Sequence, residues 1–242
     1  MIRSSSGVRV EVAAAKVSKW ATGESGDTLE MIERPHGGIS FVLVDGQRSG
    51  RAAKAISNLV ARKAISELAE GVRDGAAARA AHDYLYTFKK GKVTATLNML
   101  SVDLVSNTLV LSRNSRCPVL IRTPDKGLQV LDKPADAVGV RRRVKPRITE
   151  LPLLVGTLAL MYTDGLERAG AVSTPVFDVE ENVRELIEGD VLDAREFVDR
   201  LLDRALALDR GRPRDDISLL ALRIVERDRG DRVRRLSVDL PL

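Results

Sequence analysis

The order of hydrophobic patterns along the chain places the strongest constraint on its fold. Short apolar or alternating runs, which are typical of β-strands, come first and are followed by two long segments with helical spacing. Several more strand-like runs, two further helical segments and final strands complete the sequence. Strands and helices grouped in blocks predict a layered α+β fold with antiparallel sheets, whereas single alternation would predict parallel βαβ units.

Local signals set the expected bounds of these elements. Ser49 and Asp193 are well placed as N-caps, because short polar side chains accept hydrogen bonds from the free N–H groups of a helix start. We expect one domain over residues 1–242, with a core at about 8–226 and an added C-terminal edge strand at about 232–238. The predicted helices lie between Ser49 and Gly71 and at 75–88, 179–188 and 194–208, and the other predicted strands are at 8–12, 29–33, 39–44, 93–104, 108–113, 119–123, 128–131, in a run ending at 164, and at 217–225.

The charge of the chain does not by itself indicate a function. The formal net charge is +5, and basic residues cluster at 141–143 and in the tail ERDRGDRVRR. Aromatic residues make up only 3% of the chain, so few side chains can stack on nucleic-acid bases. Such runs are usually solvated, and an acidic or phosphorylated protein partner is equally compatible with them. We therefore expect no nucleic-acid partner, with a basic nucleic-acid binder kept as a third hypothesis.

Other features of composition indicate where the protein works. No apolar run approaches the roughly 20 residues of a membrane-spanning helix, and the first residues contain no apolar signal core. The single cysteine, Cys117, excludes an internal disulfide and favours a reducing compartment. We therefore expect a cytoplasmic protein without a membrane partner, in which Cys117 is a small core residue.

Acidic residues stand where predicted strands begin or end. Each Asp-Gly pair alone is typical of a turn, but strand ends in a buried sheet can bring several such residues together. Two carboxylates about 4 Å apart repel by roughly 4 kcal/mol at an effective dielectric constant near 20, so their convergence predicts a hard divalent cation such as Mg²⁺ or Mn²⁺. A glycine beside such a carboxylate allows its own carbonyl to approach the ion. The positions are Asp27, Asp45-Gly46, Asp164-Gly165 and Asp215-Asp216.

Six motifs in order resemble those of the metal-dependent protein phosphatases. They are GESGD, FVLVDGQRSG, KVTATLNMLSVDL, LVLSRNSRCPVLI, LALMYTDGLERAG and RDDISLLALRI. The likeness extends over roughly residues 8–226 and is strongest to the bacterial SpoIIE/RsbU/RsbX branch of the protein phosphatase 2C-like superfamily. It implies a four-layer αββα sandwich, in which two antiparallel sheets are flanked by helix pairs.

The same resemblance implies a site with two Mn²⁺ or Mg²⁺ ions. Asp45 would bridge both ions, with the Gly46 carbonyl on one of them. Asp164 and Asp215 would ligate the other ion, with Asp216 as the alternative to Asp215, and Asp27 would hold metal-bound water. Water activated in this way can attack phosphorus without a protein nucleophile, so His36 and His82 are expected to be structural or exposed.

The resemblance also implies a reaction and a partner. The expected activity is a phosphoserine/phosphothreonine protein phosphatase acting on a regulatory protein, such as an anti-sigma-factor antagonist or a stressosome-type protein. The alternative is a catalytically silent phosphatase fold that serves as a binding module. Gln47 stands where eukaryotic members carry a histidine, and the segment at 165–177 is expected to be a mobile flap beside the site.

Overall fold

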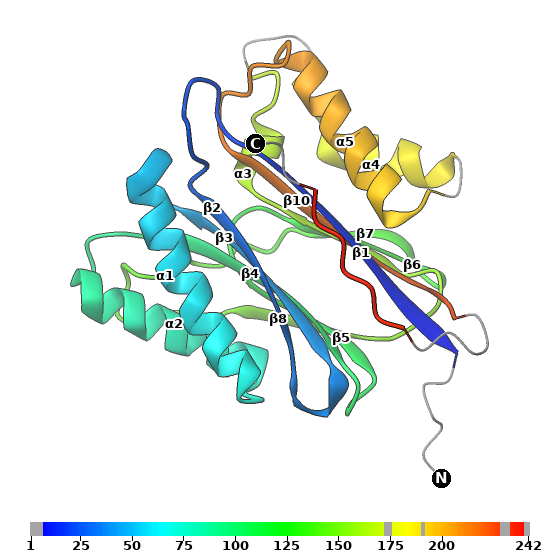
Figure 1. Cartoon of the computed structure of the whole chain (residues 1–242), viewed down its shortest axis with the longest axis horizontal. Coiled ribbons are helices and arrows are strands. Elements are labelled where there is room, and N and C mark those ends of the chain that lie inside the picture. The colour runs from blue at the N-terminus through cyan, green and yellow to red at the C-terminus, as the bar shows by residue number, and fades with distance from the viewer. Residues whose placement is uncertain (1–6, 172–175, 190–191, 228–232, 240–242) are drawn as a thin grey trace.

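Two five-stranded antiparallel sheets pack face to face, and helices cover the outer face of each sheet (Figure 1). The computed structural model describes residues 7–171, 176–189, 192–227 and 233–239. The α+β class predicted from the block order and the αββα layering implied by the resemblance are both confirmed. Within the described ranges, no helix is both long and apolar enough to cross a membrane.

The first sheet has the strand order β2-β3-β4-β5-β8 and carries α1 and α2 on its outer face (Figure 1). Its strand β3 is buried on both sides: Phe41 and Leu43 belong to the core between the sheets, whereas Val42 packs under the helices. This alternation explains why the run FVLV is continuously apolar. The elements are β2 (Asp27–Glu33), β3 (Ile39–Gly46), α1 (Gly50–Ala69), α2 (Asp74–Lys89), β4 (Ala95–Asp103), β5 (Thr108–Asn114) and β8 (Arg147–Pro152).

The second sheet has the strand order β1-β10-β9-β6-β7. Along β10, Leu220 and Leu222 enter the core between the sheets, while Leu219 and Ala221 pack on the side of α4 and α5. Both sheets therefore share one inner core and have separate outer cores. The elements are β1 (Val8–Val17), β6 (Val119–Thr123), β7 (Gly127–Leu131), β9 (Leu158–Tyr162), α3 (Asp164–Glu167), α4 (Val179–Glu188), α5 (Ala194–Leu208) and β10 (Ile217–Glu226).

The helix starts differ in how they are capped. Asp193 accepts a hydrogen bond from the Glu196 N–H at 2.8 Å, so the predicted cap of α5 is confirmed. Asp178 caps α4 in the same way, which the sequence analysis did not predict. Ser49 occupies the N-cap position of α1 with an extended backbone, but its side chain makes no capping hydrogen bond.

Two edges of the fold differ from the prediction. Strand β8 was missed because only alternate residues of RITELP are even half-buried, which is a weak apolar pattern for an edge strand. The predicted strand at 232–238 is wrong: residues 233–239 form no strand, and Arg232 lies outside the described residues. Val233 and Leu236 are 63% and 74% exposed, so this segment lacks the burial that would hold it in a ladder. Its Arg234 instead forms an ion pair with Glu33 at 2.8 Å.

The chain after β9 also departs from the expectation. The strand predicted to end at Asp164 ends two residues earlier, at Tyr162 of β9, and Asp164 begins the short helix α3. Leu166 and Ala169 are fully buried in the core, so the first part of the expected flap is packed against the fold. Residues 172–175 of that expected flap lie outside the described residues.

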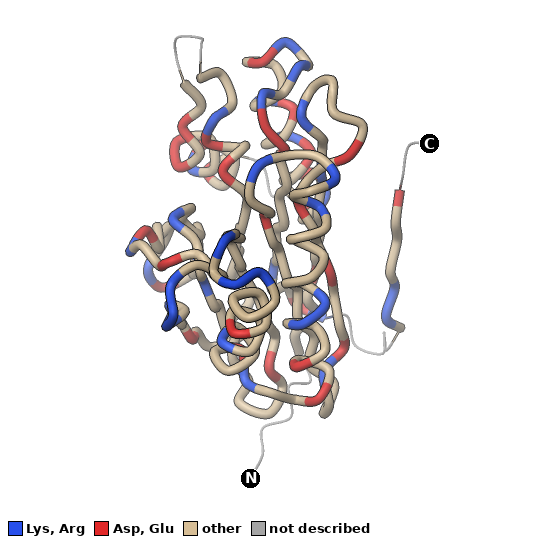
Figure 2. Tube along the Cα trace, turned by 90° about the vertical axis from the view of Figure 1, so that its left-hand side faces the viewer, with Lys and Arg blue, Asp and Glu red and all other residues tan. Residues whose placement is uncertain are grey.

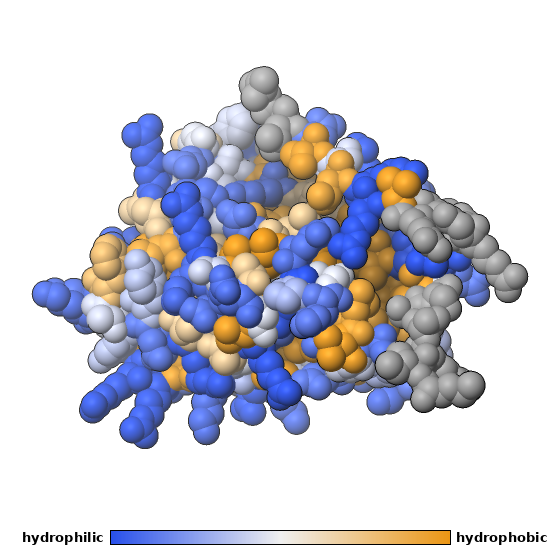
Figure 3. Space-filling model, turned by 60° about the horizontal axis from the view of Figure 1, so that its bottom comes forward, coloured by the Kyte–Doolittle hydropathy of each residue, from blue (hydrophilic) through white to orange (hydrophobic). Residues whose placement is uncertain are grey.

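The turns β2–β3 and β4–β5 lie together at one end of the sandwich (Figure 1). In Figure 3, which brings this end forward, hydrophobic side chains lie in several groups between hydrophilic ones. Val105 in the β4–β5 turn is 71% exposed. The acidic strand ends lie at the opposite end of β2 and β3, and this end holds the candidate site.

Candidate metal centre

Both sheets contribute acidic residues to one cavity of about 280 Å³ at the end of the sandwich where β2 begins and β3 ends. Asp27 and Asp45 are directly opposite each other in the β2–β3 ladder. Asp164 follows β9, and the pair at 215–216 directly precedes β10. The predicted acidic positions therefore lie together in the fold. The cavity is lined by Lys19, Asp27, Asp45, Gly46, Gln47, Arg48, Ser49, Thr94, Ala95, Thr96, Asp164, Arg168, Asp215 and Asp216.

Asp27 links the two sheets from a buried position. Its Oδ2 accepts hydrogen bonds from Thr163 Oγ1 at 2.9 Å and from Ser218 Oγ at 2.7 Å, both of which belong to the second sheet or its strand ends. Burial raises the pKa of Asp27 to about 7, although the hydroxyls of Ser218 and Thr163 act in the opposite direction. The backbone carbonyl of Asp27 accepts hydrogen bonds from the ammonium groups of Lys16 and Lys54.

Asp45 occupies the most strongly acidic surroundings. Burial, together with the negative charges of Asp27, Asp164 and the 215–216 pair, raises its pKa to about 8. In the absence of a cation, this carboxyl therefore carries a proton near neutral pH. A bound cation would offset the repulsion between the carboxylates and would therefore lower the pKa of Asp45, so that the carboxyl could ionise at neutral pH.

Arg168 lies between two of the predicted metal ligands. Its guanidinium is 2.7 Å from Asp164 Oδ2 and donates to Asp215 Oδ2 at 2.6 Å. Burial raises the pKa of Asp164 and Arg168 lowers it, while the charge of Asp164 raises the pKa of Arg168. The side chain of Arg168 is 57% exposed, so it can move away without opening the core. Sequence reasoning missed this residue, because the segment after Asp164 was expected to be a flap and the short helix α3 was not predicted.

Asp215 and Asp216 have different environments. Asp216 is buried, and its two oxygens accept hydrogen bonds from the backbone N–H groups of Lys19 at 2.9 Å and Gly26 at 2.8 Å. This carboxylate therefore holds the β1–β2 connection in place. Asp215 Oδ1 accepts a hydrogen bond from the N–H of the next residue, Asp216, at 3.1 Å, and its Oδ2 contacts Arg168 in the cavity. The environments favour Asp215 over Asp216 as the residue available to an ion.

The glycines beside the aspartates are required by close packing. A Cβ added to Gly46 would lie 2.1 Å from the carbonyl oxygen of Ala53 in α1, and a Cβ on Gly165 would lie 2.1 Å from the carbonyl oxygen of Asp216. These distances leave no room for a side chain. The need for glycine at 46 and 165 thus has a packing cause that the sequence analysis did not identify. The proposed contact of the Gly46 carbonyl with an ion stays a prediction.

The rim of the cavity is basic and partly strained. Arg48 has a positive φ of 75°, which is uncommon for a residue with a side chain. Gln47, at the position where eukaryotic relatives have histidine, accepts a hydrogen bond from the Thr94 N–H through its Oε1 at 3.1 Å. This hydrogen bond connects the residue after β3 with the residue before β4. Lys19, Arg48 and Arg168 are the cations that line the cavity, and none was singled out from the sequence.

The histidines and the cysteine lie outside this cavity. Nδ1 of His82 accepts a hydrogen bond from the Gly139 N–H at 3.1 Å in a buried position. Burial and the charge of Glu167 raise the pKa of the Cys117 thiol to about 12, so almost no thiolate forms at neutral pH. His36 belongs to a short 3₁₀ turn between β2 and β3, at the other end of the sandwich. None of these three residues is placed for nucleophilic catalysis at the acidic cavity.

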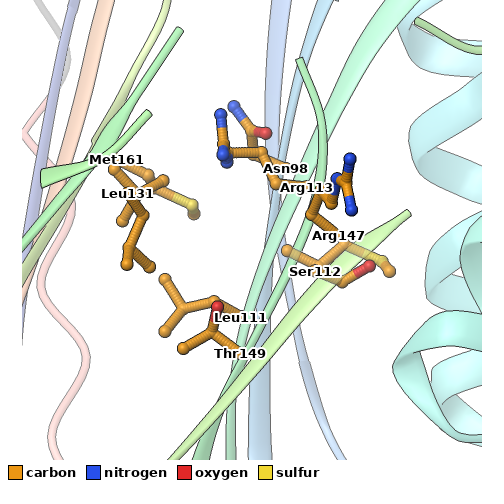
Figure 4. A pocket seen from close by; sticks show the side chains of 10 residues that line it. Asn98, Leu111, Ser112, Arg113, Leu131, Arg147, Thr149 and Met161 are labelled. Carbon is orange, nitrogen blue, oxygen red and sulfur yellow. The ribbon is translucent and has the colours of Figure 1, made fainter. Parts of the chain in front are cut away.

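A second and much smaller cavity of about 20 Å³ lies between the sheets (Figure 4). Its lining includes Leu131 and Met161 from one sheet and Asn98 and Ser112 from the other. Asn98 Oδ1 and Ser112 Oγ are buried without a hydrogen-bond partner among the described residues. The volume is large enough for one ordered water. No carboxylate lines this cavity, so it is not a candidate metal site.

The donor set of the larger cavity fits hard divalent ions. Its acidic members are all aspartates, and carboxylate oxygens are among the ligands that Mg²⁺ and Mn²⁺ prefer. Among the residues that the structure describes, no group of three or more His, Cys, Asp or Glu side chains could hold a metal ion as it stands. The ion pairs of Arg168 with Asp164 and Asp215 give a physical reason, because one cation already engages two of the donors.

A model of the family described as stage II sporulation protein E (SpoIIE) matches residues 35–225 of the chain. The chain is similar to the PP2C phosphatase domain, solved with a fragment of the regulatory domain, of SpoIIE from Bacillus subtilis. The TM-score is 0.79 and the identity 20%, covering 92% of this chain and 65% of that one. The chain thus spans about two thirds of the length of that SpoIIE structure.

Two further solved structures share the fold. The RsbU and RsbW domains of a Mycobacterium tuberculosis protein give a TM-score of 0.69 at 20% identity, covering 90% of this chain and 60% of that one. The catalytic domain of the serine/threonine phosphatase PstP, in complex with two manganese ions, gives a TM-score of 0.65 at 18% identity, covering 90% of this chain and 99% of that one. No curated protein matches the chain significantly in sequence.

Proposed function

The chain belongs to the SpoIIE family, and on this basis we propose that it is a metal-dependent phosphatase that hydrolyses phosphoserine and phosphothreonine in proteins. The observation that carries the proposal is the convergence of Asp27, Asp45, Asp164 and Asp215 from both sheets on one cavity. Such a cluster is costly without a cation and suits divalent ions. The phosphatase domains with the same fold support the choice of reaction.

The proposed cofactor is a pair of Mn²⁺ or Mg²⁺ ions. Asp45 and the Gly46 carbonyl would hold one ion, with Asp45 shared between both, while Asp164 and Asp215 would hold the second. Such ions supply Lewis-acid chemistry, lowering the pKa of a nucleophilic water and offsetting the phosphoryl charge. The manganese ions of the PstP structure support this assignment.

Residues of the chain itself would prepare the site. Asp27 keeps the two sheets in register through its bonds to Thr163 and Ser218, and it faces the cavity where water would be oriented. Arg168 would release Asp164 and Asp215 when an ion binds, and its exposed guanidinium would then be free to bind phosphoryl oxygens. Arg48 and Lys19 on the rim would attract the anionic group.

The proposed substrate is a phosphorylated regulatory protein of a bacterial partner-switching pathway, such as an anti-sigma-factor antagonist or a stressosome-type protein. Similarity to the RsbU and RsbW domains supports this class. We place the activity in the cytoplasm, because the single cysteine favours a reducing compartment.

Phosphate release from p-nitrophenyl phosphate and from a phosphothreonine peptide tests the function. We expect hydrolysis with Mn²⁺ or Mg²⁺, none with chelator, and a loss of roughly 100-fold or more in Asp45→Asn and Asp164→Asn. Asp203→Asn, at an exposed position on α5, is the matched control and should keep full activity. Full activity in chelator would contradict a metal-dependent reaction. A folded wild type that binds Mn²⁺ but releases no phosphate from either substrate would favour the alternative, a silent binding module.

A further inference from the structure

Two basic segments form one surface next to the acidic cavity. The first is the C-terminal end of α2 with the residues after it, and it contributes Lys89, Lys90 and Lys92. The second is the connection between β7 and β8 with its run of arginines at 141–143. The segments touch: a Cβ added to Gly91 would lie 3.5 Å from the Val140 carbonyl oxygen. Figure 2 faces this side of the molecule and shows blue segments close together there.

The connection between β7 and β8 is pinned to the end of α2. The Gly139 N–H donates to His82 Nδ1 of α2 at 3.1 Å, and a Cβ at Gly139 would lie 2.5 Å from both Leu85 and the Val93 carbonyl oxygen. Val144 is buried just after the arginine run. The arginines are therefore presented from a segment anchored on both sides.

The cations of this surface lack counter-charges. Arg141 pairs with Asp136 at 2.8 Å, but within the part of the chain that the structure describes the other cations form no ion pair. The arginines of α4 and α5 differ, because Arg184 and Arg200 each pair with a glutamate one turn away. We name the following six residues the basic surface: Lys89, Lys90, Lys92, Arg142, Arg143 and Lys145.

The basic surface is continuous with the cavity. Val138 pairs with Ala95 in an isolated β-bridge, and both Thr94 and Ala95 line the cavity. Thr94 is in turn bonded to Gln47 of the β3 end in both directions, at 3.1 and 3.2 Å. Lys92 is thus two residues along the backbone from the cavity wall.

Two exposed aromatic rings border the same surface. Tyr84 and Phe88 are 45% and 59% exposed, and their rings stack with centroids 6.1 Å apart. The Lys89 ammonium lies 5.0 Å from the centroid of the Phe88 ring. Aromatic residues and arginines are both enriched in the energetic centres of protein–protein interfaces.

We propose that the basic surface docks an acidic face of the phosphoprotein substrate while its phosphorylated residue enters the cavity. This inference rests on the proposed phosphatase function and adds how the partner is chosen. Uncompensated positive charge attracts a negative partner and speeds encounter, and the effect weakens as salt is added. A cavity of about 280 Å³ can take a phosphorylated side chain but not the rest of a protein, so recognition of the partner comes from the adjoining surface.

Two phosphothreonine peptides of equal length provide the probe, one with aspartates flanking the phosphorylated residue and one with asparagines in their place. The test variant carries Lys92→Glu, Arg142→Glu and Arg143→Glu. The matched control carries Arg62→Glu, Arg73→Glu and Arg79→Glu, which make the same charge change at exposed positions on α1, at the N-cap of α2 and in its first half. Circular dichroism melting checks that all proteins are folded.

We expect the wild type to prefer the aspartate peptide by about tenfold in kcat/KM at low salt, mainly through KM, and to lose the preference near 1 M salt. The test variant should lose the preference at low salt, and the control variant should keep it. Both variants should hydrolyse p-nitrophenyl phosphate as the wild type does. An equal preference in test variant and wild type, or no preference in the wild type, overturns the proposal.

Fluorescence anisotropy of the labelled aspartate peptide in chelator separates this inference from the proposed function. Binding by the wild type and loss of binding in the test variant would support the basic surface even if no peptide were hydrolysed. Hydrolysis of p-nitrophenyl phosphate without any difference between the peptides would leave the phosphatase function in place and remove the docking proposal. Binding of single-stranded DNA through the basic surface, with no preference for the acidic peptide, would also overturn it.

Discussion

The helix layer formed by α1 and α2 and the layer formed by α4 and α5 cover equivalent faces of the sandwich but meet their sheets differently. On α1, small side chains such as Ala53, Ala61 and Ala64 are fully buried and bring the helix backbone close to β3. On α5, larger side chains such as Phe197 and Leu201 fill the space above the second sheet. The close approach occurs at the acidic cavity, where the position of β3 decides the position of Asp45.

The outer surfaces of the two layers differ as well. Arginines on α4 and α5 are paired with acids on the same or the neighbouring helix, as Arg204 is with Glu185 at 2.8 Å. The end of α2 and the residues after it instead present lysines that form no ion pair with any residue the structure describes. The difference indicates that one layer shapes and surrounds the site, while the other mainly closes a core. Three substitutions test this contrast.

The largest effect should come from Gly46→Ala. The added methyl group would lie 2.1 Å from the Ala53 carbonyl oxygen, so either α1 or β3 must shift. We expect a loss of about 3 kcal/mol in the free energy of unfolding and a large loss of metal-dependent hydrolysis. Gly189→Ala after α4 is the control, because its Cβ would lie 3.4 Å from the nearest atom and should cost roughly 0.5 kcal/mol or less. Urea denaturation measures both, and equal losses would remove the contrast.

The next effect concerns the dependence of stability on pH in chelator. The folded-state pKa values of Asp27 and Asp45, about 7 and about 8, are raised above the ordinary aspartate value of 3.8. Their contribution to stability is therefore fully present below pH 4 and is lost as pH rises through 7 and 8. At pH 9 we expect Asp45→Asn to melt about 4 to 8 °C above the wild type, for a gain of roughly 2 kcal/mol.

The same melting series provides its own control. Asp203→Asn should follow the wild-type curve at every pH, because this exposed residue of α5 lies far from the cavity lining. Added Mn²⁺ should raise the melting temperature of the wild type more than that of Asp45→Asn. A wild type whose stability in chelator is flat between pH 6 and 9 would show that burial of these carboxylates is not costly.

The smallest effect should come from Arg168→Ala. Removing a guanidinium that engages Asp164 and Asp215 should let Mn²⁺ bind more tightly, by about three- to fivefold, because an exposed pair contributes roughly 1 kcal/mol or less. Arg204→Ala is matched in bridging two partners, Asn182 and Glu185, and should leave Mn²⁺ affinity unchanged. Isothermal titration calorimetry gives both values. Weaker Mn²⁺ binding in Arg168→Ala would mean that the arginine supports the ion instead of competing with it.

The sequence predicted most of the fold because hydrophobic period is a local property. The continuous run of β3 and the helical spacing of α1 were sufficient to place both elements. Strand β8 was not predicted because its burial depends on a neighbouring strand. The strand expected at 232–238 was wrong because the described residues 233–239 do not join the edge of either sheet as a strand. Hydrophobic periodicity shows that a segment has an apolar face. Whether another part of the chain covers that face depends on the whole fold.

The candidate site was predicted in its acidic members but not in its supporting ones. Asp27, Asp45 and Asp164 could be found because each stands beside a run of strand residues. No sequence pattern distinguishes Thr163 and Ser218, because threonine and serine are common in and beside strands. Their role is visible only from their hydrogen bonds to Asp27 in the structure. The reason for glycine at 46 was likewise hidden, because it depends on the carbonyl of a helix that starts four residues later.

The two hydroxyls on Asp27 have an evolutionary consequence. One carboxylate oxygen, buried between the sheets, is satisfied by Thr163 and Ser218 together. If both hydroxyl residues were replaced by apolar ones, the buried carboxylate oxygen would have no hydrogen-bond donor. If Asp27 were replaced by an apolar residue, the two hydroxyl groups would lose their acceptor. Substitutions at these three positions should therefore occur together in evolution. Covariation among them in related sequences would show that the two sheets evolved as one unit.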